Sequence, residues 1–278
     1  MIRDSLREAL ARMADTPVLW ITGLYLGALF ALDLLIPAAG DTTLGARIGF
    51  LGLCALPFFL GGTYGVIRAD GAGLRGYLES GARYYFTILL AAAVIVAAGF
   101  VTVLLLLVPF TLLGGTPLEF LPVAVLGVGI PFAFFTFFSD TAAVFEDRKV
   151  LDSIRRSVEF VLGRPGRALS FYLVNLAVGL LGLFFAVFLW SFIIADRIQP
   201  FMEANQTALF HNMTAPDLVN LIGVPGLEAG AAIGFAAVAL GATLLLTFKA
   251  CYFRRAVSAA PSAPAAGEFD EKGRWYRY

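Results

Sequence analysis

Charged residues are scarce in this chain of 278 residues. Only 14% are Asp, Glu, Lys or Arg, and 20 basic residues balance 20 acidic ones, whereas soluble domains average about 25% charged residues. The chain therefore lacks the basic surface that nucleic-acid binding requires. With 59% hydrophobic residues and a mean hydropathy of +0.84, it is neither a soluble globule nor a disordered chain. The composition is typical of a polytopic helical membrane protein, whose first partner is the lipid bilayer.

Residues that commonly carry catalysis or bind metals are equally few. The single histidine is His211, and the two cysteines, Cys54 and Cys251, fall in or beside predicted spans at different depths. These residues form no Cys/His metal site, and a disulfide between them is not expected. The sequence also lacks a nucleophile elbow, a zinc-protease motif and a phosphate-binding loop. We therefore expect a protein that is not an enzyme and that needs no metal or cofactor.

Six apolar intervals are long enough to cross a bilayer, which takes about 20 helical residues. Because the runs are continuously apolar, helices are expected and the alternating strands of a barrel are not. The predicted fold class is all-α, a polytopic transmembrane bundle over 17–255 with spans at 17–37, 48–67, 84–108, 121–143, 168–195 and 229–249. An interfacial helix at 1–16, an outer loop at 196–228 and a tail at 256–278 complete the chain.

The distribution of Lys and Arg predicts the orientation. If the N-terminus is cytoplasmic, 18 of the 20 basic residues fall on the inner side, and only Arg47 and Arg197 fall outside. This asymmetry obeys the positive-inside rule at every loop. We therefore expect a multi-pass protein of the plasma membrane with its N-terminus and C-terminus in the cytoplasm.

Two segments outside the spans have one apolar and one charged helical face. In 1–16, Leu6 and Met13 lie opposite Arg7 and Arg12, which predicts a helix that anchors on the inner leaflet or contacts a cytoplasmic partner. Apolar residues also recur at helical spacing over 150–162, and Gly163-Arg164-Pro165 follows them. That pattern predicts a second surface helix, between spans four and five.

Asp140 is the strongest candidate for a ligand or ion site. It lies about 12 Å inside the predicted inner boundary of the fourth span, where an unpaired charge costs several kcal/mol. One interpretation is a site that couples to a proton or cation. The alternative is structural, with Asp140 hydrogen-bonded to Ser139 or Thr141, or paired with Arg68 or Arg83.

Pro57 and Pro131 are further ligand candidates because each interrupts an apolar span. A shift of 80 residues aligns Arg68 with Arg148 and the residues after them, which suggests that spans two and three repeat as four and five, each pair joined by a surface helix. Broken helices in matching halves point to transporter binding sites. The prolines are 74 residues apart, so the correspondence is imperfect, and simple kinks are the alternative.

The outer loop contains two acceptor sequons for N-glycosylation. They begin at Asn205 and Asn212, each followed two residues later by Thr. Such sequons are modified only on the outer side of a membrane. Their place in the loop therefore agrees with the predicted orientation.

Short motifs near the span ends resemble those of a known group of proteins. Thr16-Pro17-Val18-Leu19 leads into the first span, and Val144-Phe145-Glu146-Asp147 precedes Ser153-Ile154-Arg155-Arg156-Ser157. With the Arg-rich start, they resemble the uncharacterised six-span integral membrane proteins of archaea. Those proteins look like distant relatives of bacterial families with a surface helix between spans four and five and a Ser ending its apolar stripe. The likeness covers most of the chain and brings no assigned activity or catalytic residues.

The architecture also resembles the permease subunits of ABC-2 type exporters. These have an amphipathic N-terminal helix, six spans, both termini inside and an outer element before span six. The resemblance implies an ATPase partner, which that family is expected to contact between spans two and three. Here the longest cytoplasmic loop falls between spans four and five instead.

The leading hypothesis is a non-enzymatic membrane protein that binds or moves a lipid-like or small apolar molecule. Under the same hypothesis it could instead support a membrane complex, as a homo-oligomer or with another membrane protein. The paired prolines, the surface helices and the missing catalytic groups motivate it. The alternative is the exporter permease.

Overall fold

The computed structural model describes the chain except for residues 39–40, 113–115, 204–214, 260–267, 270–274 and 277–278. Six helices are long and apolar enough to cross a membrane, which confirms the predicted number of spans. They cover Pro17–Ile36, Thr43–Arg68, Leu74–Leu112, Phe120–Phe145, Pro165–Arg197 and Val219–Ser258. The elements are α1 (Ile2–Asp15), the 3₁₀ turn η1 (Pro17–Leu19), α2 (Trp20–Ala38), α3 (Thr42–Arg68), α4 (Leu74–Leu112), α5 (Pro117–Thr136), α6 (Ser139–Phe145), α7 (Val150–Gly163), α8 (Pro165–Glu203), α10 (Ala215–Ser258), β1 (Glu268–Phe269) and β2 (Trp275–Tyr276).

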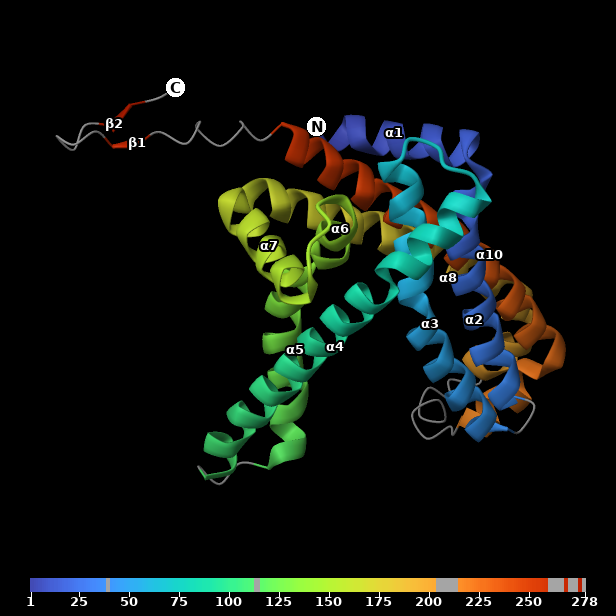
Figure 1. Ribbon diagram of the computed structural model, residues 1–278. Helices are drawn as coiled ribbons and strands as arrows, with labels where there is room; N and C mark the ends of the chain where they lie inside the picture. Colours follow the sequence, from blue (N-terminus) through green and yellow to red (C-terminus); the bar gives the residue numbers. More distant parts are fainter. Residues whose placement is uncertain (39–40, 113–115, 204–214, 260–267, 270–274, 277–278) are drawn as a thin grey trace.

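The long helices form a bundle and a hairpin whose helix α4 packs on α3 of the bundle near the inner end. In the bundle, α10 packs against α2 and α8, and α3 packs against α2. In the hairpin, α5 packs back on α4, and the pair leans away from the bundle (Figure 1). We call the end that carries α1, the turn at 69–73, α6, α7 and the end of α10 the inner end, since the charge asymmetry predicts it to be cytoplasmic.

Two helices at the inner end do not cross the bundle, and both lie where amphipathic segments are predicted. Helix α1 runs across the inner end beside the end of α10 (Figure 1) and buries Ser5, Ala9 and Met13. Helix α7 buries Ser153, Ser157 and nearby apolar residues, and its charged face is exposed. Each helix covers the inner ends of the spans with its buried face.

The turn between α3 and α4 does not form the predicted surface helix. Helix α4 runs unbroken from Leu74 to Leu112, so the residues before the predicted span at 84–108 continue it. The reason is that this stretch has no proline, whereas Gly163-Arg164-Pro165 separates α7 from α8. The turn itself is tight, with Asp70 and Gly71 at φ of 53° and 110°. The prediction for this loop was therefore wrong, and the loop provides no support for the proposed repeat.

Close helix packing depends on small residues at the crossing of α2 and α10. A Cβ atom at Gly23 would lie 2.0 Å from Thr243 Oγ1 and 2.2 Å from the Ala239 carbonyl oxygen. At Gly27 it would lie 2.6 Å from the Phe235 carbonyl oxygen. These distances are below any normal contact, so only glycine allows the two backbones to approach this closely.

The buried core gathers at the inner end. Its aromatic centre packs Phe138 against Phe160 and against Tyr252, with ring centroids 4.8 Å and 6.0 Å apart, and Phe171 stacks on Tyr252 at 4.0 Å. Toward the outer end, large apolar side chains of α4, α5 and α8 are exposed. Those surfaces face the lipid of a bilayer.

Candidate functional site

The main candidate site is an ion pair within the spans. Lys249 Nζ on α10 lies 2.7 Å from Asp140 Oδ1 and 2.8 Å from Asp140 Oδ2 on α6. Tyr64 of α3 donates its hydroxyl proton to Asp140 Oδ2 at 3.0 Å, and the Thr141 backbone N–H donates to Oδ1 at 2.7 Å. We call Asp140, Lys249 and Tyr64 the Asp140 cluster. It joins three elements that are far apart in the sequence.

The cluster is almost entirely removed from solvent. Lys249 is 7% exposed and Tyr64 is fully buried, whereas the Asp140 side chain is 16% exposed. Lys249 lies nine residues before Ser258, about 13 Å along the helix from the end of α10. Its ammonium group also lies 4.4 Å from the centre of the Phe137 ring, a cation–π contact. The charges therefore compensate one another in an apolar setting where neither would be stable alone.

A break in the fourth span positions Asp140. Helix α5 ends at Thr136 and α6 begins at Ser139, so Asp140 lies in the first turn after the interruption. Ser157 of α7 bridges the break, since its hydroxyl donates to the Phe135 carbonyl at 2.7 Å and accepts from the Phe138 N–H at 3.0 Å. A side chain from the surface helix thus replaces the backbone hydrogen bonds that the break removes.

The prolines singled out in the sequence do not form this break. Helix α3 continues through Pro57, and α5 continues past Pro131 to Thr136. Pro57 precedes Tyr64 by about 10 Å along α3, and Pro131 precedes Asp140 by nine residues. The other candidates, Asn205 and Asn212, lie outside the described residues.

The structural alternative predicts a hydrogen bond or an ion pair for Asp140, and the structure contains both. The partner in the ion pair differs from the predicted one. Thr141 does hydrogen-bond to Asp140, through its backbone N–H, but the ion pair is with Lys249 and not with Arg68 or Arg83. The charge pattern predicts that the sixth span ends at Lys249. The residues Ala250-Cys251-Tyr252-Phe253 continue the apolar helix beyond it. A lone lysine inside such a run, at a depth similar to Asp140, was the signal that could have identified the pair.

A second ionic cluster lies next to the first, at the corner between α6 and α7. Asp147 accepts hydrogen bonds from Arg68 at 2.6 Å, from Arg83 at 3.2 Å and from the Tyr84 hydroxyl. Arg68 also donates to the Val144 carbonyl at 2.6 Å, at the end of α6. The hydrogen bond from Arg68 lowers the pKa of Asp147 to about 2, and Tyr84 adds to the effect. This cluster fixes α6 to the inner ends of α3 and α4.

A third cluster fixes α1 across the inner end. Glu8 accepts from Arg12 at 3.1 Å, from Arg254 and from Arg255 at 2.5 Å, while Asp70 accepts from Arg12 and Arg254 at 2.6 Å each. Burial alone would raise the pKa of Glu8, but the arginine hydrogen bonds lower it. Hydrogen bonds from Arg12 and Arg254 also lower the pKa of Asp70. Both carboxylates therefore remain charged at neutral pH and hold α1 to α10 and to the turn at 69–73.

Within the described ranges, no group of three or more His, Cys, Asp and Glu side chains is placed to hold a metal ion. Hydroxyl groups also meet inside the spans. Thr22 of α2, for example, lies 2.6 Å from the Thr63 hydroxyl oxygen of α3 and 2.8 Å from the Tyr77 hydroxyl oxygen of α4. This hydroxyl cluster joins three helices and is fully buried. Hydrogen bonding between helices is its evident role.

The chain belongs to the family described as Domain of unknown function (DUF7847), whose model matches residues 1–256. The match covers the six candidate spans almost completely and ends two residues before α10 does. No curated protein and no solved structure matches the chain. The protein is a multi-pass membrane protein of this family.

Proposed function

We propose that the protein is a non-enzymatic membrane protein that binds or moves a lipid-like molecule, which enters sideways from the bilayer between the α4–α5 hairpin and the bundle. The observation that carries this proposal is the divergence of α4 from α3 toward the outer end (Figure 1). Membrane helices that separate in this way leave apolar faces that lipid or a lipid-like ligand must cover. The proposal places both termini in the cytoplasm at the plasma membrane, because the basic residues gather at the inner end.

The two facing helices show where the divergence begins. On α4, one face is buried from Tyr77 to Ala91. None of the described residues of α4 beyond Ala91 is buried. Leu106 lies on that same face by helical spacing and is 44% exposed. On α3, Phe58 contacts α4 beside Gly81, whereas Leu51, two turns earlier on the same face, is 65% exposed. The surfaces that meet at the inner end are therefore uncovered at the outer end.

The Asp140 cluster supplies the polar counterpart at the inner end of this separation. It joins α3 and α10 of the bundle to α6, which follows the hairpin. A ligand with a polar head could hydrogen-bond to the partly exposed Asp140 carboxylate while Lys249 keeps that charge compensated. The apolar faces would hold the rest of the molecule.

The test compares lipid exchange at two exposed leucines. A photo-crosslinking amino acid replaces Leu51, or replaces Leu183 on α8, which is similarly exposed at 60%. The protein is placed in nanodiscs with a tritium-labelled phospholipid, and unlabelled lipid is then added in excess. We expect crosslinked label at position 51 to persist after the label at position 183 has been exchanged away. Equal exchange at both positions would contradict the proposal.

Crosslinks from position 51 to a second protein chain, in place of lipid, would instead favour a role in a membrane complex or homo-oligomer. The exporter permease makes a different prediction, namely co-purification with an ATPase. The turn between spans two and three comprises only residues 69–73, and Asp70 within it is engaged by Arg12 and Arg254. This loop offers little surface for an ATPase, so the lipid-like ligand is the better supported function.

A further inference from the structure

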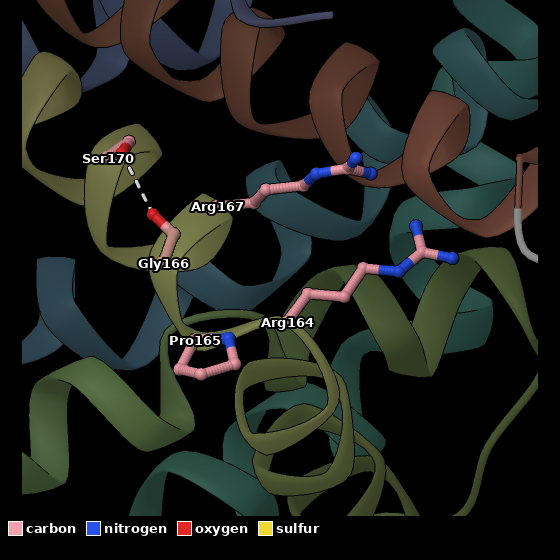
Figure 2. A pocket seen from close by; sticks show the side chains of 5 residues that line it. All are labelled: Arg164, Pro165, Gly166, Arg167 and Ser170. Carbon is pink, nitrogen blue, oxygen red and sulfur yellow. Dashed lines mark hydrogen bonds between the residues drawn. The ribbon is translucent and has the colours of Figure 1, made fainter.

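Two adjoining cavities, both open to the surface, lie where α8 begins at the inner end; Arg164 is half-buried there and Arg167 is exposed. The first, of about 590 Å³, is lined by the first residues of α8 and the residue before them (Figure 2): Arg164, Pro165, Gly166, Arg167 and Ser170. The second, of about 370 Å³, shares Arg167 and Ser170 with the first and extends to α1 and α10 through Met1, Ile2 and Tyr252. The two cavities form one recess at the junction of these helices.

The two arginines of the recess have no carboxylate partner among the described residues, whereas the Met1 ammonium group is paired with Asp4 at 2.8 Å. No Asp or Glu side chain of the described ranges lines either cavity. Arg164 donates one hydrogen bond, at 3.2 Å, to the Ala256 carbonyl of α10. No hydrogen bond or ion pair joins the Arg167 guanidinium to any residue that the structure describes. Two guanidinium groups three residues apart thus lack an anionic partner.

The neighbouring acidic groups are already engaged elsewhere. Glu8 and Asp70 are held by Arg12 and Arg254, and Glu146 is held by Arg156 at 2.9 Å. These carboxylates are paired with arginines, whereas the two arginines of the recess, at the same end of the molecule, are not paired with carboxylates that the structure describes. Like charges held together without a counterion repel one another, so an anion bound between them would lower the electrostatic free energy.

The geometry selects the guanidinium groups as the binding groups. The Arg164 and Arg167 side chains extend in the same direction from the start of α8, toward α10 (Figure 2). The backbone N–H groups of Arg167 and Ala168 donate to the Arg164 carbonyl, and the Ser170 hydroxyl donates to the Gly166 carbonyl at 2.8 Å. These donors are therefore occupied. The planar donor forks of the two arginines remain, and they match the oxygens of a phosphate group.

The outer surface of α8 suits the rest of a phospholipid. Leu173 and Leu181 follow Ser170 along the helix and are exposed. Apolar side chains that continue from a basic recess at the inner boundary of a span are the arrangement that anionic lipid head groups recognise. A head group in the recess would have its acyl chains beside these leucines.

We propose that the recess formed by Arg164 and Arg167 at the start of α8 binds a phosphate-bearing anion, either the head group of an anionic phospholipid or a soluble phosphate ester. This site goes beyond the function proposed above, because it lies at the start of α8 and not between α3 and α4. It requires neither the hairpin nor the Asp140 cluster. Either proposal can therefore fail without the other.

The experiment measures binding of a fluorescent phosphatidylglycerol to the full-length protein in detergent micelles. The reference is the matching phosphatidylcholine, whose phosphate is neutralised by its own choline ammonium group. The test variant is R164Q/R167Q. The matched control is R3Q/R7Q, which removes the same charge from exposed positions of α1 that line neither cavity. Two charge-assisted hydrogen bonds are worth at least one factor of ten in affinity. We therefore expect R164Q/R167Q to weaken phosphatidylglycerol binding at least about tenfold and R3Q/R7Q to leave it within about twofold.

Competition with glycerol phosphate distinguishes the two sources of phosphate. If glycerol phosphate displaces the lipid only at concentrations far above that of phosphatidylglycerol, the membrane lipid is the occupant. If it displaces the lipid at an equal concentration, the soluble ester is the occupant. If both double variants lost the same amount of phosphatidylglycerol affinity, the proposal would be overturned. Such a result would show that affinity depends on the overall charge of the protein and not on this recess. Equal binding of phosphatidylcholine would overturn it too. If R164Q/R167Q does not fold, R167Q alone provides the test, since the Arg167 guanidinium holds no described residue in place.

Discussion

Replacing Lys249 by Met isolates the energy of the buried ion pair. The substitution keeps most of the side-chain volume and leaves Asp140 with two remaining donors, the Tyr64 hydroxyl and the Thr141 N–H. Removing one partner of a buried pair costs about 3–5 kcal/mol, because the other charge remains buried without compensation. We expect Lys249→Met to reduce the free energy of unfolding by that amount.

The chain contains a matched control for burial. Arg75 and Glu79 on α4 form an ion pair with the same N–O separation, 2.7 Å, but their side chains are 92% and 65% exposed. Exposed pairs contribute about 0–1 kcal/mol. Arg75→Met should therefore change the unfolding free energy by less than about 1 kcal/mol, although it removes a pair of the same length.

The assay is reversible unfolding in mixed micelles of a mild detergent and dodecyl sulfate, followed by circular dichroism. The double variant Lys249→Met/Asp140→Asn should be more stable than Lys249→Met alone, since no buried charge is left uncompensated. The reasoning would be refuted if the double variant lost as much unfolding free energy as the two single variants together. Such additivity would mean that the two charges do not stabilise each other. Equal losses for Lys249→Met and Arg75→Met would refute it as well.

Three other predictions follow from the packing, the ionic clusters and the topology. Gly23→Ala should lower stability in the same assay by about 1–3 kcal/mol, whereas Gly127→Ala, whose Cβ would meet nothing within 4 Å, should not lower it. Asp147 has a folded-state pKa of about 2 against an ordinary 3.8, so its contribution is present above pH 4 and is lost as pH falls through 2. Asp147→Asn should therefore flatten the pH dependence of the unfolding midpoint between pH 4 and pH 2, and an unchanged slope would contradict the assignment. In a cysteine-free background on intact cells, Thr42→Cys should react with an impermeant thiol reagent and the exposed Asp152→Cys should not; the reverse pattern would invert the predicted orientation.

The spans and the surface helices could be predicted from the sequence because their signals are local. Charges delimit each apolar run, and 150–162 repeats its apolar residues at helical spacing before Pro165 prevents continuation. The break in the fourth span could not be placed in this way. It lies at 137–138 and not at Pro131, because a hydroxyl from Ser157, about 20 residues further on, satisfies the interrupted backbone. That compensation is a tertiary contact.

For the partner of Asp140, the sequence offers only an indication: a lone lysine at a similar depth, with no local pattern that joins the two residues. Lys249 lies 109 residues further along the chain, and pairing them requires knowing that α10 passes beside α6. The lean of the hairpin was hidden for a different reason. Beyond Arg83, helix α4 is apolar all round, as is α5 from Phe120 on, so the pattern there contains no stripe that indicates which face packs inward. The exposure of α4 beyond Ala91 appears only in three dimensions.

The polar contacts and the exposed apolar surfaces lie in different parts of the molecule. The three ionic clusters lie at the inner end, where they join α1, α3, α4, α6 and α10 through hydrogen-bonded charges. The outer halves of α4, α5 and α8 carry large exposed apolar residues, whose contacts with lipid and with one another are interchangeable. Directional bonds resist displacement, whereas apolar surfaces in lipid slide at little cost. The directional contacts of the hairpin are therefore concentrated at the inner end, and the Asp140 cluster lies beside the break that Ser157 bridges.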